Sequence, residues 1–208
     1  MRKRHYRTNL KGSKQMAYIE FNKGKKIILG SNSPRRKQLL QDVGINFEIR
    51  AFPTNENYPT KLKGSEITEY LVKKKSQEFK GVKDDEIIIT ADTIVWAQNE
   101  HLGKPNNTTE AKKFLEKISN MKHEVITSVC FTEKEKQTII SESTFVFFKK
   151  ISNSEINYYL KKFVFLDKAG AYGIQDWIGI IGVKRIEGSY TNVIGLPVSQ
   201  VIDVLQKL

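Results

Sequence analysis

The sequence predicts an α/β fold in which strands and helices alternate around one sheet. Residues Ile27–Leu29 are an apolar run typical of a buried strand, and Ser33 with Pro34 then begins a helix. A second run, Glu86–Ala91, is β-branched and apolar in its middle, which also favours a strand. With 208 residues, the chain is long enough for one large domain or for two small lobes that share a cleft.

The first helix carries an unusual pair of cations at its start. It is predicted to run from Ser33 to about Val43, which puts Arg35 and Arg36 in the first turn. The free N–H groups and the helix dipole at that end favour an anion rather than a cation. Backbone N–H groups, guanidinium groups and the hydroxyls of Ser31 and Ser33 are complementary to phosphate. A phosphate site is therefore one interpretation, and a capped surface helix with solvated arginines is the other.

A loop and a second helix follow this first unit. Residues 45–49 are predicted to form a short strand, and residues 52–59 a loop that two prolines restrain. The loop holds one acid, Glu56, which by itself is typical of a solvated side chain. The next helix is expected to span Ser65–Lys80, with Lys75 in a lysine run typical of a solvated face.

Asp92 is the second candidate carboxylate. It is expected at the carboxyl end of strand 86–91, which is where open α/β sheets build their sites. Thr93 and a second short strand, 94–96, follow it. A hairpin then brings Lys104 into a loop, so that Lys104 and Asp92 are predicted to face one cleft. At this place Asp92 is well positioned to hold a divalent metal or to accept a proton from water. The alternative is that Asp92 only caps a turn.

The second half of the chain is predicted to contain an antiparallel strand pair and further helices. His101, which follows a turn predicted at 98–100, is expected to be exposed. The single cysteine, Cys130, is expected to be a packed thiol. Helices are expected from Asn107 to Ser119, from Ser154 onward and from Pro197 to Leu205. Strands are expected at 125–131, 138–148 and 178–183, and a loop at 188–192.

The glycine-rich segment Gly170–Gly173 precedes Gln175. Glycines at this spacing allow the backbone to approach a ligand closely, and the amide of Gln175 can make two hydrogen bonds to the edge of a nucleobase. The Walker phosphate-binding pattern, the dinucleotide glycine fingerprint and a cluster of His and Cys are absent from the sequence. These absences disfavour an ATPase, a nicotinamide enzyme and a structural zinc site.

The net charge of +12 is unevenly distributed along the chain. Residues 1–26 carry nine basic residues and one acid, a net charge of +8, which leaves +4 for the other 182 residues. Residues 1–24 are therefore predicted to be a basic, disordered extension, and residues 25–208 the folded domain. The extension has no interleaved aromatic pattern beyond Tyr6, so nucleic acid is not the expected partner. No signal sequence or membrane span is predicted, and the expected location is the cytoplasm.

Three blocks of the sequence form a set of motifs. They are Gly-Ser-Asn-Ser-Pro-Arg-Arg at 30–36, Ala-Asp-Thr-Ile-Val at 91–95 with Leu-Gly-Lys-Pro at 102–105, and Asp-Lys-Ala-Gly-Ala-Tyr-Gly-Ile-Gln at 167–175 with Gly-Leu-Pro at 195–197. In this order they resemble the motifs of the Maf family, nucleoside triphosphate pyrophosphatases that cut between the α and β phosphates. The resemblance implies a mixed twisted sheet flanked by helices, with two lobes around a central cleft, similar to inosine triphosphate pyrophosphatases.

The resemblance also implies roles for individual residues. Asp92 and Glu56 are expected to hold a divalent metal cation, Mg²⁺ or Mn²⁺, and Asp92 to activate the attacking water. Lys75 and Lys104 complete the expected catalytic set. Substrate binding is implied for Ser31, Ser33, Arg35, Arg36, Thr93 and Gln175.

Block 167–175 is similar to the branch of the family that prefers dTTP and UTP. The resemblance therefore implies hydrolysis of these nucleotides to the monophosphate and pyrophosphate. Three alternatives stay open: a 7-methyl-GTP pyrophosphatase of the same family, a non-catalytic nucleotide-binding regulator of cell division and septum formation, and a nucleic-acid-binding protein driven by the basic extension. The oligomeric state is also open, with a homodimer among the alternatives.

Deletion of residues 1–22 is expected to leave catalysis unchanged, because this segment precedes the first strand and supplies no motif residue. The measurement is kcat/KM on dTTP for the full-length and the truncated chain, with a thermal melt of each as the control for folding. A truncated chain that melts normally but has lost activity would show that the predicted domain boundary is wrong.

Overall fold

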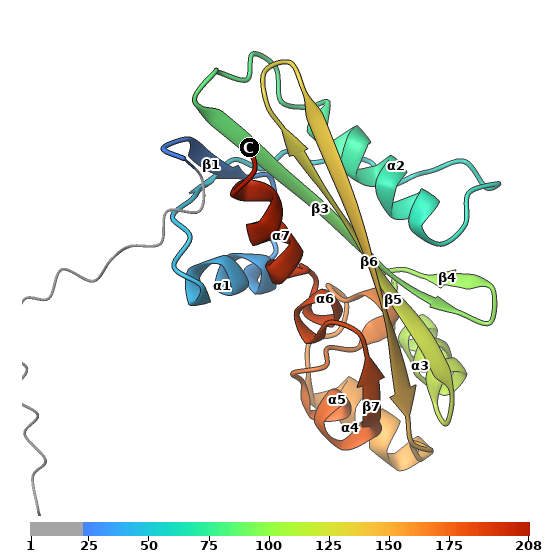
Figure 1. Cartoon of the computed structure of the whole chain (residues 1–208). Helices are drawn as coiled ribbons and strands as arrows, with labels where there is room; N and C mark the ends of the chain where they lie inside the picture. The colour runs from blue at the N-terminus through green and yellow to red at the C-terminus, as the bar shows by residue number, and fades with distance from the viewer. Residues whose placement is uncertain (1–22) are drawn as a thin grey trace, which may run out of the picture.

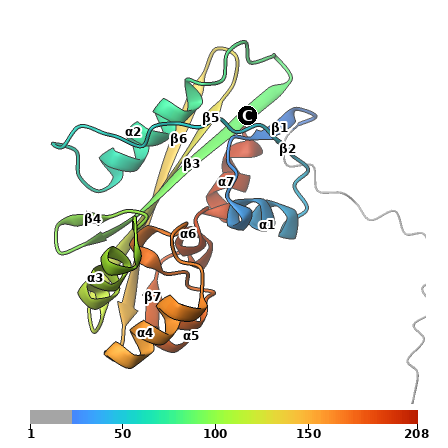
Figure 2. The same cartoon turned by 180° about the vertical axis from the view of Figure 1, so that it is seen from behind.

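The computed structural model describes residues 23–208, which form one seven-stranded mixed sheet with helices on its faces (Figures 1 and 2). The predicted α/β fold is confirmed. Of the predicted extension, residues 1–22 lie outside the described part of the chain. The strand order is β2-β1-β3-β5-β6-β7, and β4 pairs with β3.

The strands are β1 (Lys26–Leu29), β2 (Glu48–Ile49), β3 (Glu86–Ala97), β4 (Glu100–Leu102), β5 (Lys122–Thr132), β6 (Gln137–Phe148) and β7 (Val183–Glu187). The helices are α1 (Pro34–Asp42), α2 (Ser65–Ser76), α3 (Thr108–Ile118), α4 (Asn153–Lys162), α5 (Trp177–Gly182), α6 (Tyr190–Ile194) and α7 (Val198–Leu205), with a short 3₁₀ turn, η1 (Ala169–Ala171).

The long strand β3 corrects one prediction. It is a single strand of 12 residues, where the sequence predicted two strands separated at Asp92. The parallel partner β1 pairs with it only as far as Ile89, whereas β5 pairs with it up to Trp96. Asp92 therefore lies within β3, three residues past the end of its pairing with β1, and not at a carboxyl end. Pairing with β5 keeps the strand regular through this point.

Pairing along the other edge of β3 leaves a gap. β1 pairs with β3 up to Ile89, and β4 pairs with it from Val95 onward. Within residues 23–208, no strand occupies this edge of β3 between those two points, along Thr90–Ile94. The predicted central cleft lies at this gap.

Two hydrophobic clusters lie at the two ends of the long strands. One cluster packs α1 and α7 against β1 and the first half of β3. The other packs α3, α4 and α5 against the second half of β3 and the ends of β5 and β6. Figure 1 shows α1 and α7 to one side of the long strands and α3, α4 and α5 at their lower end, which gives the two lobes that the sequence predicted.

Several helix and strand boundaries differ from the predictions. The second helix ends at Ser76 rather than Lys80. The strand predicted at 45–49 is reduced to the two residues of β2. Helix α4 begins one residue earlier than predicted, because Ser152 and Glu155 form a capping box there. The antiparallel pair β5 and β6, the start of α3 after Asn107, and the buried thiol of Cys130 are confirmed.

The prediction of a strand at 178–183 is wrong. These residues form most of α5, and the strand β7 begins only at Val183. Ile178, Gly179 and Gly182 are buried, which is the spacing of a helix face, while Ile180 is 72% exposed. The predicted loop at 188–192 is also wrong, because α6 occupies most of it.

Residues 23–208 contain no helix with the length and hydrophobicity needed to cross a bilayer.

Replacing Gly179 with Ala is expected to destabilise the fold by about 1 to 3 kcal/mol. A Cβ atom at this position would lie 2.4 Å from the carbonyl oxygen of Gly173 and 2.5 Å from that of Ile174, and backbone cannot move aside easily. Urea denaturation measures the free energy of unfolding. The matched control is Ile180→Ala on the same helix, which is expected to change it by only about 0.5 kcal/mol because the side chain is exposed. Equal effects would contradict the packing of α5.

Candidate active site

A cleft of about 490 Å³ opens at the gap on the edge of β3. It collects residues from α1, α2, β3 and the loops that follow β1, β2, β4 and α4. All ten residues that the sequence predicted for the site line this cleft: Ser31, Ser33, Arg35, Arg36, Glu56, Lys75, Asp92, Thr93, Lys104 and Gln175.

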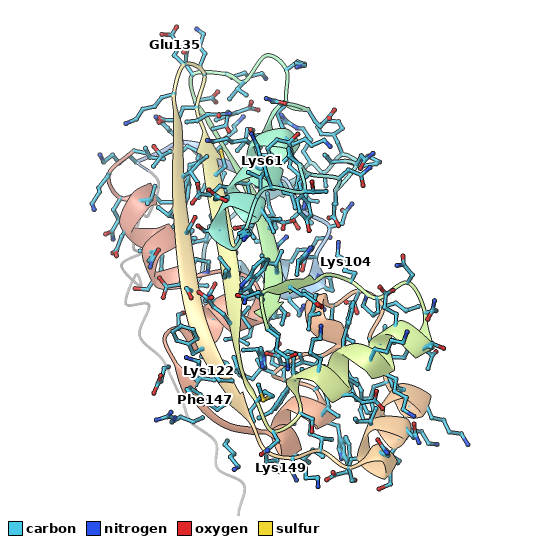
Figure 3. All side chains as sticks on the ribbon, turned by 90° about the vertical axis from the view of Figure 1, so that its right-hand side faces the viewer. Lys61, Lys104, Lys122, Glu135, Phe147 and Lys149 are labelled. Carbon is cyan, nitrogen blue, oxygen red and sulfur yellow. The ribbon has the colours of Figure 1, made fainter. Side chains whose placement is uncertain are left out.

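Two carboxylates and two ammonium groups form a cluster in the cleft. The Nζ atom of Lys75 lies 2.5 Å from Oδ1 of Asp92 and 3.1 Å from Oε1 of Glu56. Lys104, which lies between α2 and α3 in Figure 3, donates to both carboxylate oxygens of Glu56 at 3.0 and 3.1 Å. Burial alone would raise the pKa of Glu56, but Lys75 and Lys104 outweigh it and lower that pKa. Glu56 is therefore ionised, and its charge is matched by the two lysines.

Arg36 connects three parts of the fold. Its guanidinium group donates to the carbonyl oxygen of Gly195 at 2.8 Å, to Oγ1 of Thr93 at 3.0 Å and to Oγ of Ser31 at 3.3 Å. Burial lowers the pKa of Arg36, and Asp92 opposes this shift. These hydrogen bonds hold the start of α1 against β3 and against the turn before α7. The arginine is thus already engaged by uncharged protein groups, which neither interpretation of the helix start anticipated.

Arg35 forms an ion pair with Asp167. It donates to Oδ2 of Asp167 at 2.6 Å and to the carbonyl oxygen of the same residue at 3.0 Å. The buried Lys168 binds the other carboxylate oxygen of Asp167 at 2.9 Å and lies 3.5 Å from Asp176, which also accepts a hydrogen bond from Tyr159. Burial alone would raise the pKa of Asp167, but Lys168 and Arg35 together lower it.

Asp167 and Lys168 line the cleft, and the sequence did not single them out. Both stand in the third motif block, but an adjacent acid and lysine have no spacing that distinguishes a site from a surface. Only the fold brings Arg35, 132 residues earlier in the chain, to Asp167.

The prediction that His101 is exposed is wrong. Its ring is partly buried and lines the cleft, and its Nδ1 atom lies 2.7 Å from the hydroxyl of Tyr58. Burial lowers the pKa of His101, although Asp92 and Glu56 oppose this shift. Because Tyr58 follows Glu56 by two residues, this hydrogen bond ties the loop of Glu56 to β4.

The glycine-rich segment packs closely against other parts of the protein. A Cβ atom at Gly170 would lie 2.8 Å from the side chain of Val95, and φ at Gly170 is +66°, which favours glycine. A Cβ atom at Gly173 would lie 2.8 Å from a carboxylate oxygen of Asp176. These glycines therefore allow η1 and the turn that carries Gln175 to pack tightly, and the expected approach to a ligand is not needed to explain them.

The donor set of the cleft fits a hard divalent cation. Asp92 and Glu56 offer carboxylate oxygens, and both contact the same ammonium group of Lys75. Residues 23–208 contain no cluster of three or more His, Cys, Asp or Glu side chains arranged to hold a metal. Mg²⁺ typically binds through one or two carboxylates, waters and substrate phosphates. The two carboxylates therefore fit a cation that the substrate helps to hold, and not a closed structural site.

Comparison with known proteins identifies the family. The model of the Maf-like protein family matches residues 26–208. The chain belongs to the Maf family. The match covers all three motif blocks, so the resemblance predicted from them is confirmed.

Curated relatives in the Maf family align over nearly their whole length. The dTTP/UTP pyrophosphatase of Flavobacterium johnsoniae is 48% identical over 88% of this chain and 95% of its own. The proteins of the same name from Flavobacterium psychrophilum and Cytophaga hutchinsonii are each 50% identical, over 85% and 88% of this chain and 91% and 84% of theirs. Among solved structures, the Staphylococcus aureus Ham1 protein aligns with 60% of this chain and 72% of its own, at 12% identity and a TM-score of 0.39, which is too low to support any argument.

Replacing Arg36 with Ala is expected to lower the free energy of unfolding by about 1 to 3 kcal/mol without any ligand, because Gly195, Thr93 and Ser31 would all lose their hydrogen bonds from the guanidinium group. The measurement is urea denaturation. Lys37→Ala, which removes the same charge from the next position of α1, is the control and is expected to have little effect. Unchanged stability of the Arg36 variant would show that this side chain serves only the ligand.

Proposed function

We propose that this chain hydrolyses dTTP and UTP to the nucleoside monophosphate and pyrophosphate. The observation that carries the proposal is the cleft at β3, where two carboxylates, two lysines and Arg35 gather around one cavity. Relatives 48 to 50% identical over most of both chains bear the name dTTP/UTP pyrophosphatase, which supports the choice of substrate. Residues 25–208 are proposed as the catalytic domain.

In this proposal, the cationic side chains of the cleft bind the triphosphate. The ammonium groups of Lys75 and Lys104 and the guanidinium group of Arg35 donate hydrogen bonds to phosphate oxygens. Negative charge accumulates on the pyrophosphate as its bond to the α phosphorus breaks. Fixed positive groups beside it stabilise this charge more than they stabilise the bound substrate, and this difference accelerates the reaction.

The carboxylates accept a proton from the attacking water and would bind the metal cation. A carboxylate oxygen of Asp92 accepts the proton of the water that attacks phosphorus. The proposed cofactor is Mg²⁺ or Mn²⁺, which the carboxylate oxygens of Asp92 and Glu56 would hold. When bound, the cation neutralises phosphate charge and makes phosphorus more electrophilic.

Gln175 is proposed to read the base. The edge of thymine or uracil offers an N–H group between two carbonyl groups, and a glutamine amide can both donate to and accept from it. Arg35 and Thr93 complete the proposed base-selecting set, as the family resemblance implied. A cytoplasmic location and a homodimer stay predictions.

Replacing Asp92 with Asn is expected to lower kcat on dTTP by about 10²-fold or more while the protein stays folded, because an amide cannot accept the proton of water. Steady-state release of pyrophosphate, coupled to an inorganic pyrophosphatase, gives kcat. A thermal melt checks folding. A folded variant with a rate near wild type would remove Asp92 from the mechanism, and a wild-type chain that binds dTTP without releasing pyrophosphate would favour the non-catalytic regulator.

A substrate panel tests the proposed base preference. With Mg²⁺ and with Mn²⁺, kcat/KM is expected to be higher for dTTP and UTP than for ATP, GTP and 7-methyl-GTP. Gln175→Ala is expected to reduce this preference by about tenfold, the equivalent of one hydrogen bond of about 1.4 kcal/mol, and to reduce kcat on dTTP less. If 7-methyl-GTP ranks first, the sister-branch assignment replaces this one and the pyrophosphatase chemistry stands.

A further inference from the structure

Lys75 contacts one oxygen of each carboxylate that would hold a metal cation. Its ammonium group bridges Asp92 and Glu56, at 2.5 and 3.1 Å. The side chains of Lys75 and Asp92 are only 16% and 9% exposed, so little solvent screens this pair. Lys104 holds the remaining oxygen of Glu56. The two carboxylates are thus neutralised by two lysines within the protein.

A divalent cation and the ammonium group of Lys75 compete for the same place. A cation bound to Asp92 and Glu56 would repel an ammonium group that contacts the same two carboxylates. Lys75 must therefore withdraw before the cation binds. A triphosphate provides the alternative partner, because its oxygens can accept the hydrogen bonds that Lys75 and Lys104 now make to the carboxylates.

The side chain of Lys75 can make this exchange without movement of its helix. α2 is held to the sheet by a hydrogen bond between the hydroxyls of Thr68 and Ser128 at 2.6 Å and by one from Thr90 to the carbonyl oxygen of Val72 at 3.1 Å. The lysine side chain is a flexible four-carbon stem, so its ammonium group can reach a new acceptor while the backbone stays in place.

We propose that Lys75 makes metal binding at Asp92 and Glu56 depend on the nucleotide. Without a triphosphate in the cleft, the lysine holds the two carboxylates and weakens their affinity for the cation. With a triphosphate, it binds phosphate oxygens and releases the carboxylates. The inference rests on the proposed function for the identity of the nucleotide. By linkage, the cation then strengthens nucleotide binding by the same factor, typically about 5- to 150-fold.

The neighbouring lysine offers a matched control. Lys74 stands beside Lys75 in the last turn of α2, but its ammonium group donates to the carbonyl oxygen of Asn57 at 3.1 Å. Replacing either lysine with Gln removes one positive charge from the same turn. Only the replacement of Lys75 removes a competitor from the two carboxylates.

The experiment is direct titration of Mn²⁺, followed by electron paramagnetic resonance, on the full chain without nucleotide. Lys75→Gln is expected to bind Mn²⁺ about tenfold more tightly than wild type, which lies in the lower part of the usual coupling range. Lys74→Gln is expected to match wild type, and Asp92→Asn to lose the site. Equal affinities of the Lys75 and Lys74 variants would overturn the proposal, as would Mn²⁺ binding that survives Asp92→Asn.

A second titration needs no variant. The α,β-methylene analogue of dTTP, which cannot be cleaved, is expected to tighten Mn²⁺ binding to the wild-type chain at least fivefold, beyond the affinity of the analogue alone for Mn²⁺. An unchanged affinity would overturn the proposal even if Lys75→Gln failed to fold. The pyrophosphate assay tests the proposed function separately: absence of turnover with the expected Mn²⁺ results would reject the reaction and keep the competition at the carboxylates.

Discussion

The early end of β1 is the constraint on which the site depends. The chain leaves the sheet at Gly30, where a Cβ atom would lie 2.8 Å from both Phe79 and Thr90, so only glycine fits the turn into α1. β3 continues past this point because β5 pairs with its other edge. The open stretch of edge gives the cleft access to both faces of the sheet. Asp92 and Thr93, which point to opposite faces of a strand, therefore line one cavity.

Charge balance organises the walls of that cavity. Three carboxylates of the cleft each have a cation in contact with them: Asp92 and Glu56 share Lys75, and Asp167 lies between Arg35 and Lys168. Removing ionised groups from water is costly unless they are paired, and these pairs keep the groups charged in a partly buried place. The same pairs are the contacts that an anionic ligand and a cation would exchange. In the proposed function, the residues that stabilise the cleft without ligand are therefore the same ones that bind the ligand.

The sequence predicted well those elements in which local pattern and tertiary packing agree. β1 and the start of α1 follow from an apolar run, a capping serine and a proline, and the pair β5 and β6 follows from alternation around a charged turn. It failed at α5, because the run Ile178–Val183 has β-branched residues but buries the face of a helix against a backbone that only Gly179 can approach. A residue's propensity is weaker than such packing.

By itself, the sequence determined the family and the kind of fold, because its three motif blocks resemble those of the Maf family, and this resemblance implied the ten residues that line the cleft. Only the tertiary structure decided what these residues touch. The bridge of Lys75 between Asp92 and Glu56 and the pairing of Arg35 with Asp167 join segments 17 to 132 residues apart. Contacts at such separations depend on how the sheet brings its strands together, and no local pattern encodes them.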